Sequence, residues 1–556
     1  MDDQIDDASS NGNMGGEKNI AMEALHAVET NNARPACFKS TIQEVFFILT
    51  CTMAIAMPAY VAGMITVISS FVGRDLNMTT AEITWLTSST SLASGAFLLF
   101  FGGVADLFGR KAMFIVSMFF FAVFTLAAGF AKTPIGIDVL SGVMGLFAAM
   151  AVPPAVGLLG AIYKPSKRKN LAFACFSGGN PLGFVFGTIF SGVATSIFNW
   201  RASFYLLAII FVLFSVIGWF TIPSDHADKQ PMTWQTIRRF DFLGVLLTVG
   251  GIGMFSAALS LGDTAQPNGW KTGYVLALLI VGLFLMIAFV FWERYFPHAL
   301  VPMDIWKDKN FSLSLGILCL GMMAFTPASF FIGLYFQEIW HKSALQVAVL
   351  ILPMAIVGMI VNVIAGLILH RVSNKLLMGL GCSAYVLSCL LFAVNRASSS
   401  YWDFCFTALM FVVVGADLQF NVANMYVMSS LPREQQSVAG GILQTVSRLA
   451  QTVGFGITTS IFNSVQQKPR MVEYYDVATQ PYAATFYFSL ACAVVSLGLV
   501  PFLTLKTQGG KAKEGSDVSS IVQEKEEKEV SASTKTTRVA QLPELGEAVR
   551  PGEKLP

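Results

Sequence analysis

Fourteen apolar runs of about twenty residues each occupy the middle of this 556-residue chain and restrict the folds open to it. A helix of about 20 residues spans the ~30 Å hydrocarbon core of a bilayer. Because the runs are continuous rather than alternating, they predict helices and argue against a β-barrel. Charged residues make up only 13% of the chain, against about 25% in soluble proteins. The sequence therefore predicts an all-α polytopic membrane protein with fourteen transmembrane helices.

The runs divide the chain into five segments. Polar segments at 1–43 and 506–556 lack apolar periodicity, and both are predicted to be disordered cytoplasmic tails. Between them we expect a six-helix bundle over 44–223, two inserted helices with their loops over 224–310, and a second six-helix bundle over 311–505.

Lys and Arg residues in the predicted loops indicate the orientation. Loops on the side of the two termini carry fifteen of them, and loops on the other side carry eight. Positive residues gather on the cytoplasmic side, so both termini are predicted to be cytoplasmic. The plasma membrane is the first expectation and the vacuolar membrane the alternative. Asn77, in the sequence Asn-Met-Thr, then lies in the first outer loop as a candidate glycosylation site.

The sequence shows no pattern that would carry catalysis or hold a cofactor. The five histidines lie too far apart to suggest a metal site. No G-x-x-x-x-G-K-[ST] loop occurs, and a net charge of +2 gives nucleic acid no electrostatic basis for binding. We therefore expect no enzyme activity, no metal and no cofactor. The expected partners are a small-molecule substrate, protons and the lipid bilayer, and the protein is expected to be a monomer.

The turn between the second and third runs reads GGVADLFGRK at residues 102–111. Gly109, just before the basic pair, can adopt backbone angles that are unfavourable for other residues. The carboxylate of Asp106 can accept hydrogen bonds at the N-terminus of a neighbouring helix. The pattern resembles the signature loop of the major facilitator superfamily, in which two six-helix bundles rock around a central cavity. The resemblance implies that the acid helps to latch a cytoplasmic gate. The residues of this gate motif are Gly102, Asp106, Gly109, Arg110 and Lys111.

A glycine pattern marks the fifth run, where residues 179–187 read GNPLGFVFG. Glycines at i, i+4 and i+8 lie on nearly one helix face and let another helix approach closely, while the proline can kink the helix. The pattern resembles the antiporter motif of drug:proton exporters, although Phe184 and Thr188 depart from it. Generic small-residue packing is the alternative. The residues concerned are Gly179, Pro181, Gly183 and Gly187.

Fourteen runs, together with the segments NWR at 199–201, FDFLG at 240–244 and LPRE at 431–434, resemble the 14-span drug:proton antiporter branch. Within that branch the chain resembles the fungal aminotriazole- and boron-resistance-type exporters and related metabolite or toxin pumps. The resemblance implies export of a drug, toxin or secondary metabolite by proton antiport and alternating access, with the proton gradient as energy source. A proton-coupled importer of a nutrient or siderophore, and a non-transporting receptor on the same scaffold, stay open.

Two departures from the branch leave the proton carrier open. Serine stands in the fourth run, at Ser141, where relatives carry an arginine tied to proton coupling. The first run also lacks an aspartate that many relatives have.

Asp417 and Arg448 are the charged residues that fall near the middle of their runs. They lie 15 residues before Pro432 and 15 after Arg433, so a helical hairpin would place them at similar depth. We expect them to pair in a transport cavity, with Asp417 carrying the driving proton. A static ion pair that only fixes helix packing is the alternative. The candidate coupling and cavity residues are Asp417, Asn421, Asn424, Gln444, Arg448 and Gln451.

Overall fold

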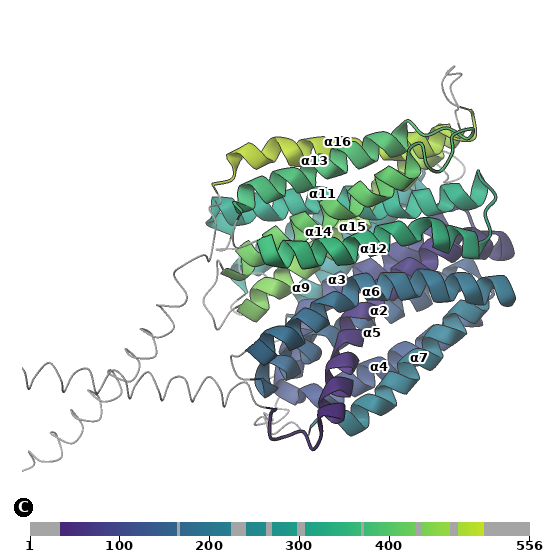
Figure 1. The fold of residues 1–556 in the computed structure, drawn as a ribbon. Helices are drawn as coiled ribbons and strands as arrows, with labels where there is room; N and C mark the ends of the chain where they lie inside the picture. The colour runs from purple at the N-terminus through teal and green to yellow at the C-terminus, as the bar shows by residue number, and fades with distance from the viewer. Residues whose placement is uncertain are drawn as a thin grey trace, which may run out of the picture. The chain divides into compact units, whose positions relative to one another are not determined.

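The computed structural model describes residues 34–163, 167–223, 241–262, 269–296, 306–368, 372–429, 436–467 and 476–504, all within one compact unit. These residues form fourteen long α-helices, two short 3-10 helices and no strand (Figure 1). The α-helices are α2 (Thr41–Leu76), α3 (Thr80–Phe108), α4 (Arg110–Gly129), α5 (Pro134–Ile162), α6 (Lys167–Ile197), α7 (Trp200–Thr221), α9 (Phe242–Leu261), α10 (Gly273–Tyr295), α11 (Lys309–Glu338), α12 (Ala344–Ile368), α13 (Asn374–Ala393), α14 (Cys405–Ser429), α15 (Gln436–Gln467) and α16 (Gln480–Leu499). The 3-10 helices are η1 (Gly269–Lys271) and η4 (Val500–Phe502). Residues 1–33 and 505–556 of the predicted tails lie outside the described residues.

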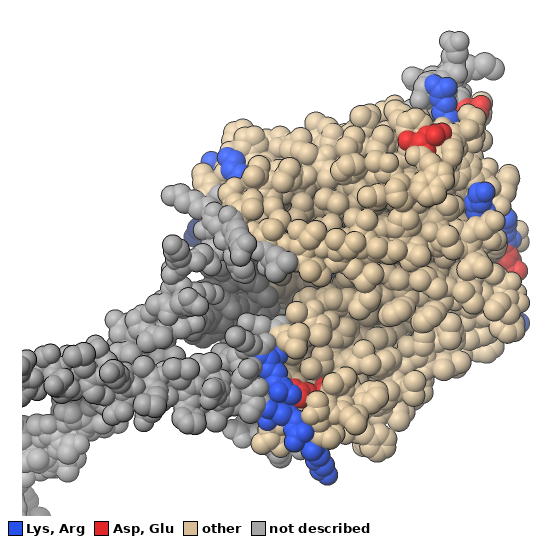
Figure 2. All heavy atoms as spheres, in the orientation of Figure 1, with Lys and Arg blue, Asp and Glu red and all other residues tan. Residues whose placement is uncertain are grey.

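Thirteen of the described helices are long and apolar enough to cross a membrane. The fourteenth, α15, has 32 residues and is about 48 Å long, but it is more polar because it carries Arg448, Gln444 and Gln451. On the face drawn in Figure 2, charged side chains gather at the two ends and leave a broad uncharged band between them. The predicted all-α membrane fold is confirmed.

Polar residues between the apolar runs explain where several helices begin. The hydroxyl of Ser40 accepts a hydrogen bond from the first turn of α2, and Thr79 and Glu82 form a reciprocal capping box at the start of α3. The side chains of Asn199 and Asp241 each accept a hydrogen bond from a backbone N–H in the first turn of α7 and α9. A cap satisfies backbone N–H groups that have no partner within the helix, so these residues fix the helix starts.

The helices pack in two groups with the same internal pattern. In α2–α7, α2 packs on α6, α5 packs on α3 and α4, and α4 packs on α7. In α11–α16, α11 packs on α15, α14 packs on α12 and α13, and α13 packs on α16. The repeated pattern is that of an internal structural repeat. We call α2–α7 the first half and α11–α16 the second half.

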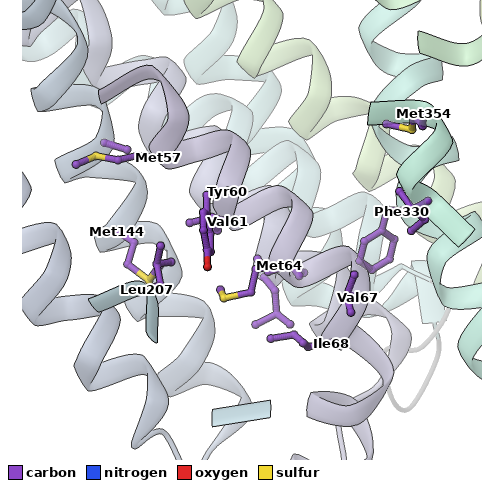
Figure 3. Close-up of a cluster of buried hydrophobic side chains, with 14 of the residues drawn as sticks. Met57, Tyr60, Val61, Met64, Val67, Ile68, Met144, Leu207, Phe330 and Met354 are labelled. Atoms are coloured by element: carbon purple, nitrogen blue, oxygen red, sulfur yellow. The ribbon is translucent and has the colours of Figure 1, made fainter. Parts of the chain in front are cut away.

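The two halves meet along two seams that the repeat also relates, α3 with α15 and α6 with α12. Between the seams, α2 of the first half contacts α11 and α12. Figure 3 shows Val67 of α2 near Phe330 of α11, with Met354 of α12 in the same apolar cluster. The apolar core therefore continues from one half into the other.

The inserted helices break the symmetry, because α9 packs on both α3 and α15. The hydroxyl of Ser256 on α9 donates to the carbonyl of Thr452 on α15 at 3.1 Å. On the other side, a Cβ built on Gly253 of α9 would lie 3.1 Å from Leu92 of α3. The outer helix α10 packs on α9. The insertion therefore covers the α3–α15 seam.

An ion pair ties helices of the first half together where α2 begins. Arg168 of α6 donates two hydrogen bonds to the carboxylate of Glu44, at 2.7 and 2.5 Å, and the hydroxyl of Tyr163 donates a third at 2.9 Å. The Glu44 carboxylate raises the pKa of Arg168, and burial raises the pKa of Tyr163. We call the end of the bundle at which α2 begins the terminal end, and the end at which α2 ends the far end.

Candidate functional site

A small cavity lies where the two halves meet, and its empty space together with its opening to solvent is about 300 Å³. Its walls come from α2 and α3 of the first half and from α11 and α15 of the second half. The lining residues are Pro58, Val61, Ala62, Thr87, Thr90, Ser91, Thr326, Arg448 and Gln451. We call it the central cavity. A site shared by two halves is remodelled when one half moves against the other, which is the position that transport requires.

Hydroxyl groups of α3 make one wall of the central cavity polar. Seven Ser and Thr residues occur within 84–94, and Thr87, Thr90 and Ser91 reach the cavity. The hydroxyl of Thr90 lies 3.1 Å from the carbonyl of Ser141 on α5. The resemblance expects an arginine at the position of Ser141. The segment of α5 that packs behind Thr90 therefore carries a hydroxyl where a cation was expected. This run of hydroxyls was not predicted as a site, although an apolar span that is rich in Ser and Thr is a readable signal.

Arg448 supplies the one positive charge among the lining residues. Its helix lies so close to α3 that a Cβ built on Gly95 would be 2.8 Å from the Cβ of Arg448. Within the described ranges, the guanidinium has no hydrogen-bond or ion-pair partner. A charge near the middle of a bilayer costs about 2.5–3.5 kcal/mol on insertion scales. Among the described residues, the cavity therefore holds a cation without a counter-charge.

The structure separates Asp417 from Arg448. Among the residues described, no ion pair joins them, because Asp417 of α14 faces α12 whereas Arg448 of α15 faces α3. A Cβ built on Gly358 of α12 would lie 3.3 Å from Oδ2 of Asp417, an oxygen with no hydrogen-bond partner in the described part of the chain. The hairpin argument gave similar depth along the two helices but could not give the rotation of each helix about its own axis.

The remaining polar candidates divide between the two places. Asn421 donates to the side-chain oxygen of Asn362 on α12 at 3.0 Å, so it belongs with Asp417 at the α12–α14 contact. Gln451 lines the central cavity beside Arg448. Asn424 and Gln444 are half-buried, and neither is among the cavity-lining residues.

The loop motif contains a single non-helical residue. Helix α3 continues to Phe108 and α4 begins at Arg110, so the turn is Gly109 alone, with a φ of 104° that favours glycine. Arg110 donates to the carbonyl of Gly157 on α5 at 3.2 Å, and Lys111 donates to the carbonyl of Ile222 after α7 at 2.6 Å. These bonds anchor the turn within the first half. The side chain of Asp106 lies outside the described residues, and a Cβ on Gly102 would meet only ordinary contacts.

The glycine pattern of α6 is a helix-packing surface against α2. A Cβ on Gly179, Gly183 or Gly187 would lie 2.6, 2.5 or 2.3 Å from a backbone carbonyl oxygen of α2. Real Cβ atoms do not approach carbonyl oxygens so closely, and only glycine allows this contact. Pro181 lies inside α6. The predicted close approach of a second helix is therefore found, and it joins helices within one half.

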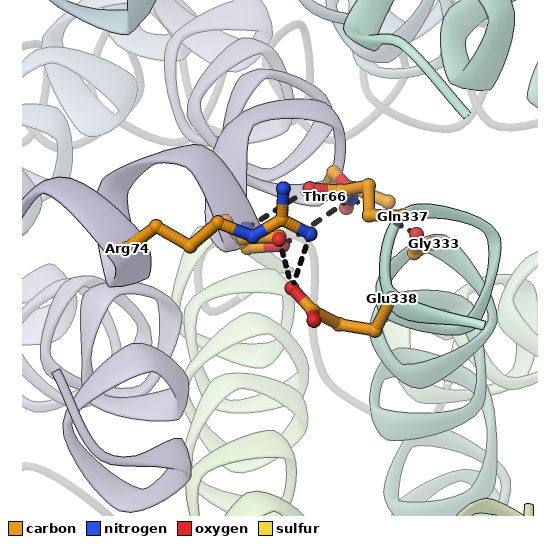
Figure 4. A network of polar contacts seen from close by, with 7 residues as sticks. Thr66, Arg74, Gly333, Gln337 and Glu338 are labelled. Carbon is orange, nitrogen blue, oxygen red and sulfur yellow. Dashed lines mark hydrogen bonds and ion pairs between the residues drawn. The ribbon is translucent and has the colours of Figure 1, made fainter. Parts of the chain in front are cut away.

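At the far end, α2 and α11 are joined across the two halves by a group of hydrogen bonds (Figure 4). The side-chain oxygen of Gln337 accepts from the N–H of Ser70 at 2.9 Å, and its amide donates to the carbonyl of Thr66 at 2.8 Å. Glu338 accepts from the hydroxyl of Ser70 and pairs with Arg74 at 3.1 Å. We call Thr66, Ser70, Arg74, Gln337 and Glu338 the far-end clamp. From the sequence these residues lie toward the ends of two spans, but no sequence pattern predicts that the two spans contact each other there.

Side chains along one face of α6 change from exposed to buried toward the far end. Ser177 and Asn180 are exposed, whereas Thr188 and Ser191 on the same face are fully buried. Near the far end of the same helix, a Cβ on Gly192 would lie 2.8 Å from α12. The α6–α12 seam is therefore closed near the far end.

Two further predictions concern modification and metals. Asn77 is exposed at the end of α2 with a φ of 51°, so the candidate glycosylation site lies at the far end. Within the described ranges, no group of three or more His, Cys, Asp or Glu side chains could hold a metal ion.

Comparison with known proteins gives the family. The chain is 28% identical over 448 residues to the low affinity ammonium transporter of Saccharomyces cerevisiae, covering 80% of this chain and 85% of that protein. It is 26% identical over 416 residues to the efflux pump terJ of Aspergillus terreus, with 74% and 79% covered. It is 24% identical over 481 residues to the aminotriazole resistance protein of Saccharomyces cerevisiae, with 84% and 86% covered.

A solved peptide transporter in complex with alafosfalin shares the fold, with a TM-score of 0.59 at 15% identity over 86% of this chain and 98% of that chain. The sequence model described as the Major Facilitator Superfamily matches residues 45–455. Because this match covers more than half of the sequence, and the relatives include fungal efflux and resistance proteins as the motifs predicted, the chain belongs to the Major Facilitator Superfamily.

Proposed function

We propose that the protein exports small organic compounds in exchange for protons by alternating access, and that it has no enzyme activity. The observation that carries the proposal is the central cavity, because each half contributes three of its polar lining residues. The similarity to fungal efflux pumps supports export as the direction. The excess of Lys and Arg in loops at the terminal end supports a cytoplasmic terminal end and an external far end.

The closed far end supports this mechanism. The far-end clamp joins the halves outside the cavity, while Ser177 and Asn180, nearer the terminal end of α6, are exposed. In the proposed cycle, compounds enter from the cytoplasm, the halves rock, and the clamp opens to release them outside. Binding can shift such an equilibrium only through interactions that differ between the two states, and residues contributed by both halves provide that difference.

Transport in vesicles tests the proposal. Inside-out vesicles from cells that express the chain should accumulate a labelled export compound when their interior is acidic, because protons leaving the interior drive the exchange. A protonophore should abolish the accumulation. Accumulation that persists without a proton gradient, or no accumulation across a broad panel of compounds, would overturn proton-driven export.

Import is the second candidate, because one relative is described as a low affinity ammonium transporter. In that case intact cells that express the chain should take up labelled methylammonium faster than control cells. The uncompensated Arg448 in the cavity disfavours a cationic cargo, so we expect no increase in methylammonium uptake.

We propose Asp417 as the proton carrier, because its side chain is half-buried and its oxygen Oδ2 is buried beside Gly358 and Asn362 without a hydrogen-bond partner among the described residues. Asp417→Asn keeps the shape but cannot gain or lose a proton. We expect this variant to lose uptake driven by the proton gradient while it retains exchange of labelled for unlabelled compound. The matched control is Asp403→Asn in the exposed turn before α14, which should transport normally. Full gradient-driven uptake by Asp417→Asn would exclude the carrier role.

A further inference from the structure

We propose that the central cavity binds an organic anion, with Arg448 as the partner of its carboxylate or of a similar oxyanion. The inference names the substrate class of the site described above, and it rests on the proposed transport function.

The first argument is the charge balance of the cavity. None of the nine lining residues is acidic, and Asp417 faces α12 rather than the cavity. Arg448 therefore has no counter-charge among the described residues. An arginine within the membrane without a partner is unfavourable, and an anionic cargo supplies the missing charge.

The other polar groups of the cavity carry the second step, because they have hydrogen bonds left to make. The hydroxyls of Thr87 and Thr326 are buried without a partner in the described structure. Gln451 makes only long contacts, 3.5 Å to the hydroxyl of Ser91 and 3.7 Å to a methionine sulfur. With the five N–H donors of Arg448, the cavity offers more donors than acceptors. A ligand oxyanion, which only accepts hydrogen bonds, matches this surplus.

The apolar part of the lining gives the third step. Pro58, Val61 and Ala62 of α2 add a small apolar surface to the hydroxyls of α3 and the cation of α15. The chemistry of the lining therefore suits a compact molecule with an apolar body and one anionic head. Such a ligand would contact both halves at once, because its head binds α15 and its body packs on α2.

Binding of matched probes to the purified full-length protein tests the inference. The probes are 1-naphthoate, the neutral 1-naphthamide and the cationic 1-naphthylmethylammonium, compared at pH 7 by the thermal shift that each produces. We expect naphthoate to bind at least about tenfold more tightly than the other two, the ratio typical of one charge-assisted hydrogen-bonded pair. Equal binding of the three probes, or no shift with naphthoate at millimolar concentration, overturns the proposal.

Variants assign the preference to the cavity. Arg448→Gln should abolish the preference for naphthoate, and Arg448→Lys should retain part of it because the charge remains. Arg396→Gln makes the same change in an exposed loop at the far end and should bind like the wild type. If Arg448→Gln elutes as a single folded species and still prefers naphthoate, the inference is wrong. If Arg448→Gln does not fold, Arg448→Lys decides, because loss of all binding in that variant also contradicts a charge-based site.

The failure of this inference and the failure of the transport proposal are distinguishable. Selective naphthoate binding without proton-driven uptake in vesicles leaves the anion site standing and removes export. Proton-driven export of neutral compounds without any anion preference supports the transport proposal and removes the anion site.

Discussion

Gly187→Ala should destabilise the protein, because a Cβ at this position would lie 2.3 Å from the carbonyl oxygen of Tyr60 on α2. The two helices must separate to accept it, and overpacking of this kind costs about 1–3 kcal/mol. The expected result is a lower midpoint of thermal unfolding, measured by the fraction of monodisperse protein that remains after stepwise heating in detergent.

Gly178→Ala on the same helix is the matched control. A Cβ at Gly178 meets nothing within 4 Å, and alanine favours a helix over glycine by about 0.5–1 kcal/mol. We therefore expect this variant to be as stable as the wild type or more so. If the two variants unfold at the same temperature, the close backbone contact between α2 and α6 is refuted.

Gln337→Ala should open the far end. Gln337 is 2% exposed, and its amide bonds to the backbone of Thr66 and Ser70 across the halves. Loss of buried hydrogen bonds that leaves partners unsatisfied costs about 1–3 kcal/mol, which corresponds to about 5–150-fold in the closed-to-open ratio. The measurement is the rate at which an impermeant maleimide, added from outside, labels Val67→Cys, whose parent side chain is fully buried. The exposed cysteines Cys37 and Cys175 are first replaced by serine.

Glu338→Gln in the same assay should have a much smaller effect, below about fivefold, because the Arg74–Glu338 pair is exposed and such pairs contribute about 0–1 kcal/mol. The matched control is Asp75→Asn, which breaks an ion pair with Arg201 at the same end but inside the first half. It should leave the labelling rate unchanged. Faster labelling in Asp75→Asn than in Gln337→Ala would show that general loosening, and not the clamp, controls access.

The comparison of sequence and structure is clearest at the charged pair. Counting residues from the turn between α14 and α15 indicated similar depth for Asp417 and Arg448, because each residue advances a helix by a fixed 1.5 Å. The count could not give the direction in which each side chain points, since that depends on which neighbours the helix meets. Asp417 meets α12, and Arg448 meets α3 and the cavity.

The glycines of α6 and the turn at Gly109 were easier to predict, because each depends on local backbone geometry. A glycine at every fourth position produces a smooth helix face in any fold, and a glycine before two basic residues allows a positive φ wherever the turn lies. The partner of each was not predictable, because α2, α5 and α7 come into contact with these segments only after the first half has assembled.

The sequence by itself determined the number of the helices and the polar residues that begin several of them, because a bilayer requires each span to satisfy its own backbone hydrogen bonds. Only the tertiary structure decided which polar groups share a cavity, which pair closes the far end and which charge is left without a partner. These facts depend on the rotation and packing of helices that are hundreds of residues apart in the chain, such as α3 with α15 and α2 with α11.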